Sequence, residues 1–296
     1  MKRYLLATRP WSFPVSVAPV LLTSLYLFAV RTETISAWPI ALWTLVSMML
    51  FHAASNLWSD FFDYHKGVDT DPSIGSPTIT GGLLTDRQTL IYASVLLVIS
   101  LLNGLALMFV TECWPLFIFG AVGALLIVLY PFFKFHALGD LDIFLTFGIL
   151  PTLGTAYVLT GELLWSSLWI TPAFATITVA VLHANNTRDT TRDSRAGIHT
   201  FAMLIGPKAC QWVYYAEIWL PLIWMVVCFV AGWGGFAWPC LAAVVLAGFL
   251  ARRNTTVMAS LTRGGNIDTL DQFTAQHQLL NTLLLSLALV AQILFF

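Results

Sequence analysis

The sequence predicts an all-α, polytopic membrane protein with nine transmembrane helices in a single domain, residues 1–296. Two observations support this fold class. Hydrophobic residues make up 58% of the chain, charged residues make up only 10%, and the mean hydropathy is +0.80; soluble domains are about 45–50% apolar and about 25% charged. The apolar residues also form continuous runs, which are typical of membrane helices, whereas the strands of an outer-membrane barrel alternate in polarity.

Nine apolar runs approach or exceed the roughly 20 residues that a helix needs to cross the hydrocarbon core. In chain order they cover residues 12–30, 38–57, 89–110, 115–131, 143–160, 167–186, 209–231, 236–251 and 277–296. Between the second and third runs, Pro72, Pro77 and several glycines predict a long irregular loop. Thr85 and Gln88 then have the spacing of a capping box, which predicts that the third helix begins there.

The basic residues predict how these helices are oriented. If the N-terminus is cytoplasmic, thirteen of the fourteen Lys and Arg residues fall on the cytoplasmic face and only Arg31 falls on the other. This asymmetry is typical of inner-membrane proteins. It predicts a multi-pass protein of the cytoplasmic membrane whose C-terminus lies outside. The net charge of −1 gives no reason to expect a nucleic-acid partner.

Two clusters of acidic residues stand out, each at the predicted cytoplasmic end of an apolar run. The first contains Asn56, Asp60, Asp63, Asp69 and Asp71, and the second contains Asn185, Asp189 and Asp193. Residues three or four apart share one face of a helix, so each cluster predicts a polar stripe. Carboxylates next to hydrocarbon are costly, which favours a site for a cation over incidental charges.

The residue types in the clusters indicate what binds there. Carboxylates without His or Cys partners are the ligands that Mg²⁺ prefers, together with phosphate oxygens of a substrate. Basic residues are interleaved with the acids, namely Lys66, Arg188, Arg192 and Arg195. Acids and bases at one site fit a metal-bound diphosphate, and the apolar helices would suit an isoprenoid tail. The sequence therefore predicts a magnesium–diphosphate site that opens to the cytoplasmic side.

These motifs resemble those of the UbiA superfamily of intramembrane prenyltransferases. The similarity is closest to the branch that contains 1,4-dihydroxy-2-naphthoate polyprenyltransferase (MenA) and the animal menaquinone-4-forming enzyme. It is strongest over the second motif, residues 185–206, and continues through the first motif at 56–69. Shorter similarities occur at residues 9–20, 137–148 and 274–276. Ser59 departs from the family pattern, which has an Asn before the Asp, and Tyr130–Phe133 departs from a Thr-Gly-Gly turn.

The resemblance implies a nine-helix UbiA fold and Mg²⁺-dependent transfer of a polyprenyl group from its diphosphate to an aromatic ring. The metal ligands expected from it are Asp60, Asp63, Asp69, Asp189 and Asp193. Catalytic roles are expected for Asp63, Asp189, Lys66 and Arg188. Substrate binding is expected of Asn56, Lys66, Lys134, Asp140, Arg188, Arg195, Asn185 and Arg9.

The acceptor that the resemblance favours is 1,4-dihydroxy-2-naphthoate, in menaquinone biosynthesis. Other UbiA acceptors stay open, namely 4-hydroxybenzoate, homogentisate, haem or a lipid. Outside the enzymes, the alternative is an ion-coupled transporter, because acids within membrane helices also mark ion pathways. His183 and Glu217 lie inside predicted spans, and the sequence leaves them open between internal packing and a site role. It indicates no oligomeric state.

Overall fold

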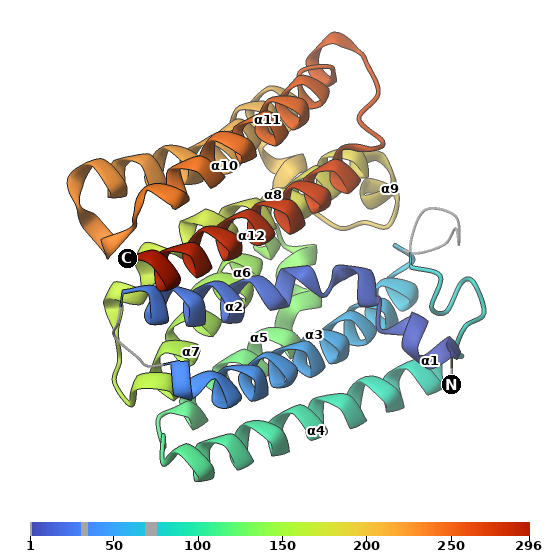
Figure 1. Cartoon of the computed structure of the whole chain (residues 1–296). Coiled ribbons are helices and arrows are strands. Elements are labelled where there is room, and N and C mark those ends of the chain that lie inside the picture. Colours follow the sequence, from blue (N-terminus) through green and yellow to red (C-terminus); the bar gives the residue numbers. More distant parts are fainter. Residues whose placement is uncertain (1, 31–34, 69–75) are drawn as a thin grey trace.

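Long helices make up nearly all of the secondary structure in the computed structural model, which describes residues 2–30, 35–68 and 76–296 (Figure 1). The α-helices are α1 (Lys2–Ala7), α2 (Pro14–Ala29), α3 (Trp38–Lys66), α4 (Asp86–Thr111), α5 (Leu116–Phe135), α6 (Gly139–Phe144), α7 (Leu150–Thr160), α8 (Pro172–Arg188), α9 (Thr190–Arg195), α10 (Phe201–Ala231), α11 (Trp238–Met258) and α12 (Leu270–Phe295). The short helical elements are η1 (Pro10–Ser12), η2 (Ile35–Ala37), η3 (Leu145–Ile149), η4 (Trp165–Trp169), η5 (Trp233–Gly235) and η6 (Leu261–Arg263).

The all-helical prediction is confirmed, and each predicted span coincides with helical structure. Within the described ranges, seven helical segments are long and apolar enough to cross a membrane, and the bent pair Lys2–Ser12 and Pro14–Ala29 makes up to eight. The sixth predicted run, 167–186, differs most: η4 occupies its start, and α8 has only 17 residues. Nine spans and the sides on which the termini lie therefore stay predictions.

The long helices lie side by side in one bundle, in which α8 and α12 are central (Figure 1). Helix α12 packs against α2, α8 and α11, while α8 also packs against α10. Helices α3 and α4 form a pair on the other side of α2. Large side chains such as Phe174, Ile177 and Tyr214 are fully buried where these helices meet. The core thus continues through α8, whose side chains are mostly enclosed by other helices.

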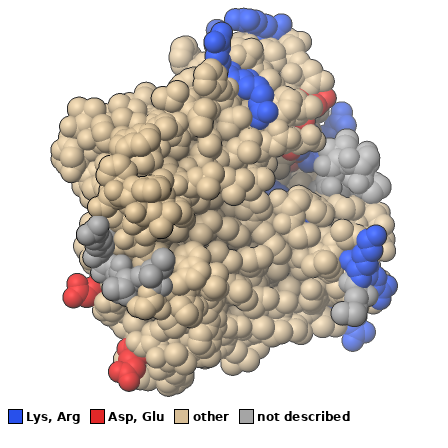
Figure 2. All heavy atoms as spheres, in the orientation of Figure 1, with Lys and Arg blue, Asp and Glu red and all other residues tan. Residues whose placement is uncertain are grey.

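The outer faces of the bundle are apolar. Leu102, Phe109 and Phe117 on α4 and α5 are each about 60% exposed, and most of the face in Figure 2 carries no charge. Large exposed apolar surfaces are rare on soluble proteins. These faces are suited to contact with lipid tails, in agreement with the predicted bilayer environment.

Three helix breaks shape the end of the bundle that carries the charges. Helix α3 ends at Gly67, whose φ of 76° is a left-handed C-cap. Helices α8 and α9 meet at Asp189. Gly206 interrupts α10 with a φ of 76° and a ψ of 168°. The capping box of Thr85 and Gln88 at the start of α4 is present, as the sequence predicts.

Candidate functional site

The first acidic cluster lies on one face of α3. Asp60 is 2% exposed and Asp63 is 4% exposed. Asp60 forms an ion pair with Arg9, which precedes η1, and accepts a 2.7 Å hydrogen bond from Ser76 Oγ. Asn56, one turn earlier on α3, donates to Thr8 O and Ser12 Oγ at 3.0 Å each. The helical stripe that the spacing predicts is therefore present, and it faces the N-terminal segment.

Asp63 is paired across the bundle with α5. Its Oδ2 accepts hydrogen bonds from Lys134 Nζ at 2.7 Å and from Ser59 Oγ at 3.1 Å. Its Oδ1 is buried and has no hydrogen-bond partner among the described residues. A buried carboxylate oxygen without a partner is uncommon in folded proteins. It is a position at which a cation or a water molecule would complete the site.

The second cluster does not lie on one continuous helix, which corrects the prediction. Asp189 has a φ of −92° and a ψ of 5°, so α8 ends before it and α9 begins after it. Two helix-type backbone hydrogen bonds still span the break. Asp189 N donates to Asn185 O (3.0 Å), and Asp193 N donates to Asp189 O (2.9 Å), so the three residues keep a spacing of four. The helix is interrupted at Asp189, whose carboxylate accepts hydrogen bonds from two arginines.

Two guanidinium groups share the Asp189 carboxylate. Arg188 reaches it with Nε at 2.9 Å and Nη2 at 2.8 Å, and Arg192 reaches it with Nη2 at 2.5 Å. Arg188 also donates to Asn185 Oδ1, and its Nη1 lies 2.6 Å from Asp271 Oδ2 at the start of α12. The forked guanidinium of Arg188 thus joins α8 to α12, a use of bidentate geometry that a lysine would not support.

The two clusters face each other across Lys134. Burial raises the pKa of Asp193 to about 6, Lys134 opposes this rise, and Asp189 and Asp63 add to it. The backbone confirms this closeness, because His199 N, shortly after α9, donates to Phe135 O beside Lys134 at 3.0 Å. The ammonium group of Lys134 therefore contacts Asp63 of the first cluster and lies within electrostatic range of Asp193 of the second. Figure 2 shows acidic and basic side chains together in a recess at this end of the molecule.

The remaining predicted residues have more varied positions. Lys66 is exposed at the end of α3, and Arg195 is exposed at the end of α9. Asp140 lies in the first turn of α6, where both of its carboxylate oxygens are buried without a partner among the described residues. The predictions for Asp69 and Asp71 fall outside the described residues.

Three residues of the site were not predicted as ligands or substrate contacts. Arg192 was noted only as an interleaved base, although its distance of three residues from Asp189 could have indicated the contact. Ser76 and Asp271 contact Asp60 and Arg188 from 16 and 83 residues away. Contacts over such separations depend on the tertiary fold and leave no signal in local spacing.

The chemistry of these residues fits a magnesium ion. Within residues 2–30, 35–68 and 76–296, no three His, Cys, Asp or Glu side chains are grouped so that they could hold a metal by themselves. Mg²⁺ does not require such a cage, because it binds through one or two carboxylates together with waters and substrate phosphates. Hard carboxylate oxygens on both clusters, and the unpaired Oδ1 of Asp63, suit that mode. Basic side chains within the same site suit the phosphates.

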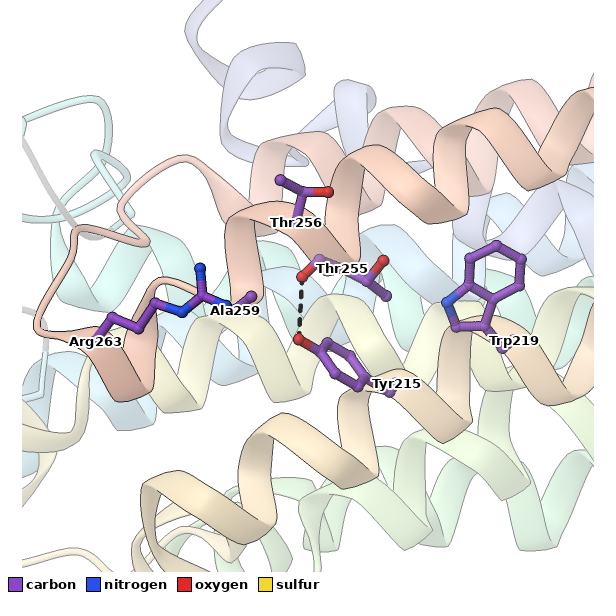
Figure 3. Close-up of a pocket in the computed structure, with 6 residues that line it drawn as sticks. All are labelled: Tyr215, Trp219, Thr255, Thr256, Ala259 and Arg263. Atoms are coloured by element: carbon purple, nitrogen blue, oxygen red, sulfur yellow. Dashed lines mark hydrogen bonds between the residues drawn. The ribbon is translucent and has the colours of Figure 1, made fainter.

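A separate cavity of about 370 Å³ lies between α10, α11 and η6 (Figure 3). Tyr215, on its wall, donates a 3.2 Å hydrogen bond to Thr255 O. The residues that line it are Tyr215, Trp219, Thr255, Thr256, Ala259 and Arg263. It contains no carboxylate and none of the predicted site residues. The charges, rather than this cavity, therefore mark the candidate site.

Solved structures with the same fold support the architecture. An apo UbiA homologue from Aeropyrum pernix K1 superposes with a TM-score of 0.70, covering 95% of this chain and 96% of that one at 14% identity. A UbiA homologue from Archaeoglobus fulgidus bound to GPP and Mg²⁺ superposes with a TM-score of 0.60, covering 96% of this chain and 99% of that one at 16% identity. At such low identity these similarities show the fold alone.

Sequence comparisons identify the family. The chain is 33% identical over 229 residues to the UbiA prenyltransferase domain-containing protein 1 homologue of Drosophila melanogaster, covering 75% of this chain and 63% of that protein. It is 32% identical over 225 residues to the human UbiA prenyltransferase domain-containing protein 1, covering 74% and 66%. The matched part thus spans slightly less than two thirds of these relatives.

These relatives confirm the predicted superfamily but give no specific support for the naphthoate branch. The fold, the paired acidic clusters and the relatives agree with the family profile, whose match extends over residues 19–260. The chain belongs to the UbiA prenyltransferase family.

Proposed function

We propose that this protein transfers a prenyl group from a prenyl diphosphate to an aromatic acceptor in a Mg²⁺-dependent reaction. The observation that carries the proposal is the meeting of two aspartate clusters around Lys134, with arginines on the second cluster. Family membership supports the reaction class. Two structures of the Archaeoglobus fulgidus homologue, bound to GPP and Mg²⁺ and to DMAPP and Mg²⁺, support the donor and the metal.

Acidic residues would bind the metal, and basic residues would bind the diphosphate. Asp63 and Asp193, with Asp60, Asp69 and Asp189, would hold the metal through carboxylate oxygens. Bound Mg²⁺ neutralises charge that develops on the departing diphosphate. Lys134 and Arg188 would meet the remaining phosphate oxygens, and preorganised donors of this kind stabilise a leaving group without reorganising. We also retain Lys66, Arg195 and Arg9 as residues that bind the diphosphate.

The assay varies the acceptor, because the two clusters recognise the donor. We propose an aromatic ring, with 1,4-dihydroxy-2-naphthoate of menaquinone biosynthesis as the first compound to test. The clusters recognise the head group of the donor, and their chemistry is the same for any acceptor. 4-Hydroxybenzoate, homogentisate and 1,4-dihydroxynaphthalene complete the panel, since each offers an electron-rich ring to an allylic carbocation.

The experiment is prenyl transfer by the purified full chain in lipid nanodiscs. Geranyl diphosphate and longer donors are incubated with each acceptor, with Mg²⁺ or with EDTA. Diphosphate release is expected only with Mg²⁺, together with a ring product that has gained one prenyl group. The prenyl group would replace a ring hydrogen or, with 1,4-dihydroxy-2-naphthoate, the ring carboxylate, which leaves as CO₂. Transfer that persists in EDTA would contradict the metal dependence, and the absence of product with every pair would contradict the reaction.

The variant Asp193→Ala tests the site within the same assay. Loss of one buried, metal-binding carboxylate is expected to reduce kcat/KM by about 100-fold or more, because the charge on the leaving group loses its stabilisation. Glu162→Ala is the control, because Glu162 is exposed in the turn after α7. If Asp193→Ala retains activity within about twofold of Glu162→Ala, the assignment of the second cluster is wrong.

A further inference from the structure

A second group of titratable side chains lies inside the bundle, apart from the two aspartate clusters. His183 on α8 is fully buried, and its Nδ1 lies 3.1 Å from Oε1 of Glu217 on α10. Asp140 on α6 is the third member, because α6 packs against α8 and its carboxylate lies within electrostatic range of His183 and Glu217. We name these three residues the interior acid cluster.

The hydrogen bonds of the interior acid cluster are incomplete. Four of its polar atoms are buried and have no hydrogen-bond partner among the described residues: His183 Nε2, Glu217 Oε2 and both carboxylate oxygens of Asp140. Native interiors leave few buried polar atoms unsatisfied. An ion pair that served only to join α8 to α10 would not need a third carboxylate with both oxygens unpaired. The arrangement indicates a polar group that is still to be bound.

Aromatic side chains form part of the surroundings of the interior acid cluster. The rings of Phe201 and Tyr214 lie edge-on to the imidazole of His183, with centroids 6.1 Å and 6.5 Å away. The Tyr214 hydroxyl is already bonded to Thr274 Oγ1 at 2.6 Å. Phe201 has no polar side-chain atom, and the hydroxyl of Tyr214 is occupied, so both residues would contribute apolar contacts to a molecule bound at the cluster. A flat ring that carries polar substituents would find both apolar and polar contacts here.

The interior acid cluster is next to the site where the prenyl group would be released. His183 precedes Asp189 by six residues on the same helix, which corresponds to about 9 Å along the axis. Tyr130 on α5 is within electrostatic range of both Asp63 and Asp140. A molecule at the cluster would thus lie beside the diphosphate site. It would be deeper in the bundle than Asp189 and Asp193.

The unpaired atoms define the ligand chemistry. Three of the four are carboxylate oxygens, which accept hydrogen bonds and repel anions. An anionic group would be disfavoured next to these oxygens, whereas a hydroxyl group would satisfy them. A carboxylate on the acceptor ring would therefore have to point away from the cluster. We infer that the interior acid cluster binds the hydroxyl groups of the aromatic acceptor and holds its ring beside the donor, an inference that rests on the proposed prenyl transfer. Glu217 and Asp140 are then positioning residues that select rings with hydroxyl substituents.

The test measures binding without turnover, by using two ligands with the same ring, one with hydroxyl groups and one in which methyl groups replace the hydroxyl protons. The probes are 1,4-dihydroxynaphthalene, kept reduced under anaerobic conditions, and 1,4-dimethoxynaphthalene. Equilibrium dialysis against the full chain in nanodiscs gives both dissociation constants. The wild type is expected to bind the diol about tenfold more tightly, as for hydrogen bonds to a charged group. Equal binding of the two compounds would mean that water alone fills the site, and would overturn the inference.

The variant Glu217→Met removes the acceptor oxygens at similar volume, and Glu162→Met makes the same change at an exposed turn. Glu217→Met is expected to reduce the preference for the diol to about twofold or less, while Glu162→Met keeps it. Unchanged binding of geranyl diphosphate with Mg²⁺ by Glu217→Met would show that this variant is folded. If it does not fold, Asp140→Asn replaces it, with the same expectation. A preference that survives in the folded variant overturns the inference.

The two proposals fail in different ways. A wild type that prefers the diol but transfers no prenyl group with any pair would contradict the proposed reaction and leave the hydroxyl site standing. Prenyl transfer together with equal binding of diol and dimethyl ether would support the reaction and remove the role of Glu217 and Asp140.

Discussion

The carboxylates of the site are held by cations that come from different parts of the chain. Arg9 pairs with Asp60 from 51 residues away, and Lys134 pairs with Asp63 from 71 residues away. A buried charge without a partner is costly, so these pairings allow acids to lie at the end of an apolar bundle. Under the proposed function, the same cations would meet phosphate oxygens once a metal engages the acids. Stability and function would then share one set of side chains.

The change Lys134→Gln tests this dual role. It removes the charge between the two clusters, and kcat is expected to fall by about 100-fold because the leaving diphosphate loses a preorganised cation. Lys208→Gln, at an exposed position on α10, is expected to stay within about twofold of the wild type. Steady-state prenyl transfer at saturating Mg²⁺ makes the comparison. Similar rates for the two variants would show that Lys134 has only a structural role.

At the scale of the elements, helices were predictable and their interruptions were not. The capping box at Thr85 is local, so its spacing identifies the start of α4. The break at Asp189 has no proline or glycine at the interruption to signal it. The π-helix Leu145–Ile149 between α6 and α7 contains only one such residue, Gly148. Gly148 lies in that π-helix, and a Cβ there would meet Ala175 Cβ on α8 at 2.8 Å. The π-helix thus occurs where two helices pack closely, and the spacing of residues along the sequence does not reveal such packing.

The kink in α10 provides a test at this scale. Gly206 has a φ of 76° and a ψ of 168°, a conformation that is essentially restricted to glycine. Gly206→Ala is therefore expected to lower the free energy of unfolding by about 1–3 kcal/mol. Gly248→Ala in α11 is the matched control, because its Cβ would enter open space and alanine favours a helix by about 1 kcal/mol.

Thermal unfolding of both alanine variants in the same detergent gives the comparison. Gly206→Ala should have the lower midpoint, and Gly248→Ala should match or exceed the wild type. A Gly206→Ala protein as stable as Gly248→Ala would show that this segment adopts an ordinary helical conformation.

At the scale of the whole molecule, charge and hydropathy describe the relation to the membrane. Exposed apolar side chains cover α4 and α5, and the site residues gather at one end of the bundle. The asymmetry of Lys and Arg predicts that this end faces the cytoplasm. We propose that the nine-span arrangement holds, with the shorter α8 as the sixth span within the bundle. The diphosphate head group of the donor would then face water, and its prenyl tail would lie in the lipid.

Cysteine labelling in intact cells tests this orientation. All four native cysteines are buried, so their reaction with a membrane-impermeant maleimide should be weak. A cysteine replacing the exposed Glu162 is expected to react from outside, and one replacing the exposed Ser194 is expected to react only after the membrane is opened. The reverse pattern would invert the topology. Labelling of both from outside would contradict nine spans.

Local properties of the sequence, hydropathy and i, i+4 spacing, predict the helical membrane class, the positions of the long helices and the two acidic clusters. The sequence also pointed to Mg²⁺ and diphosphate, since residue type alone carries that chemistry. Only the tertiary structure decided that Lys134 lies between the clusters, that Asp271 joins Arg188, and that His183, Glu217 and Asp140 meet inside the bundle. These contacts join residues 34 to 83 positions apart in the chain. Their closeness follows from how helices pack, and packing depends on the shapes of all the side chains together.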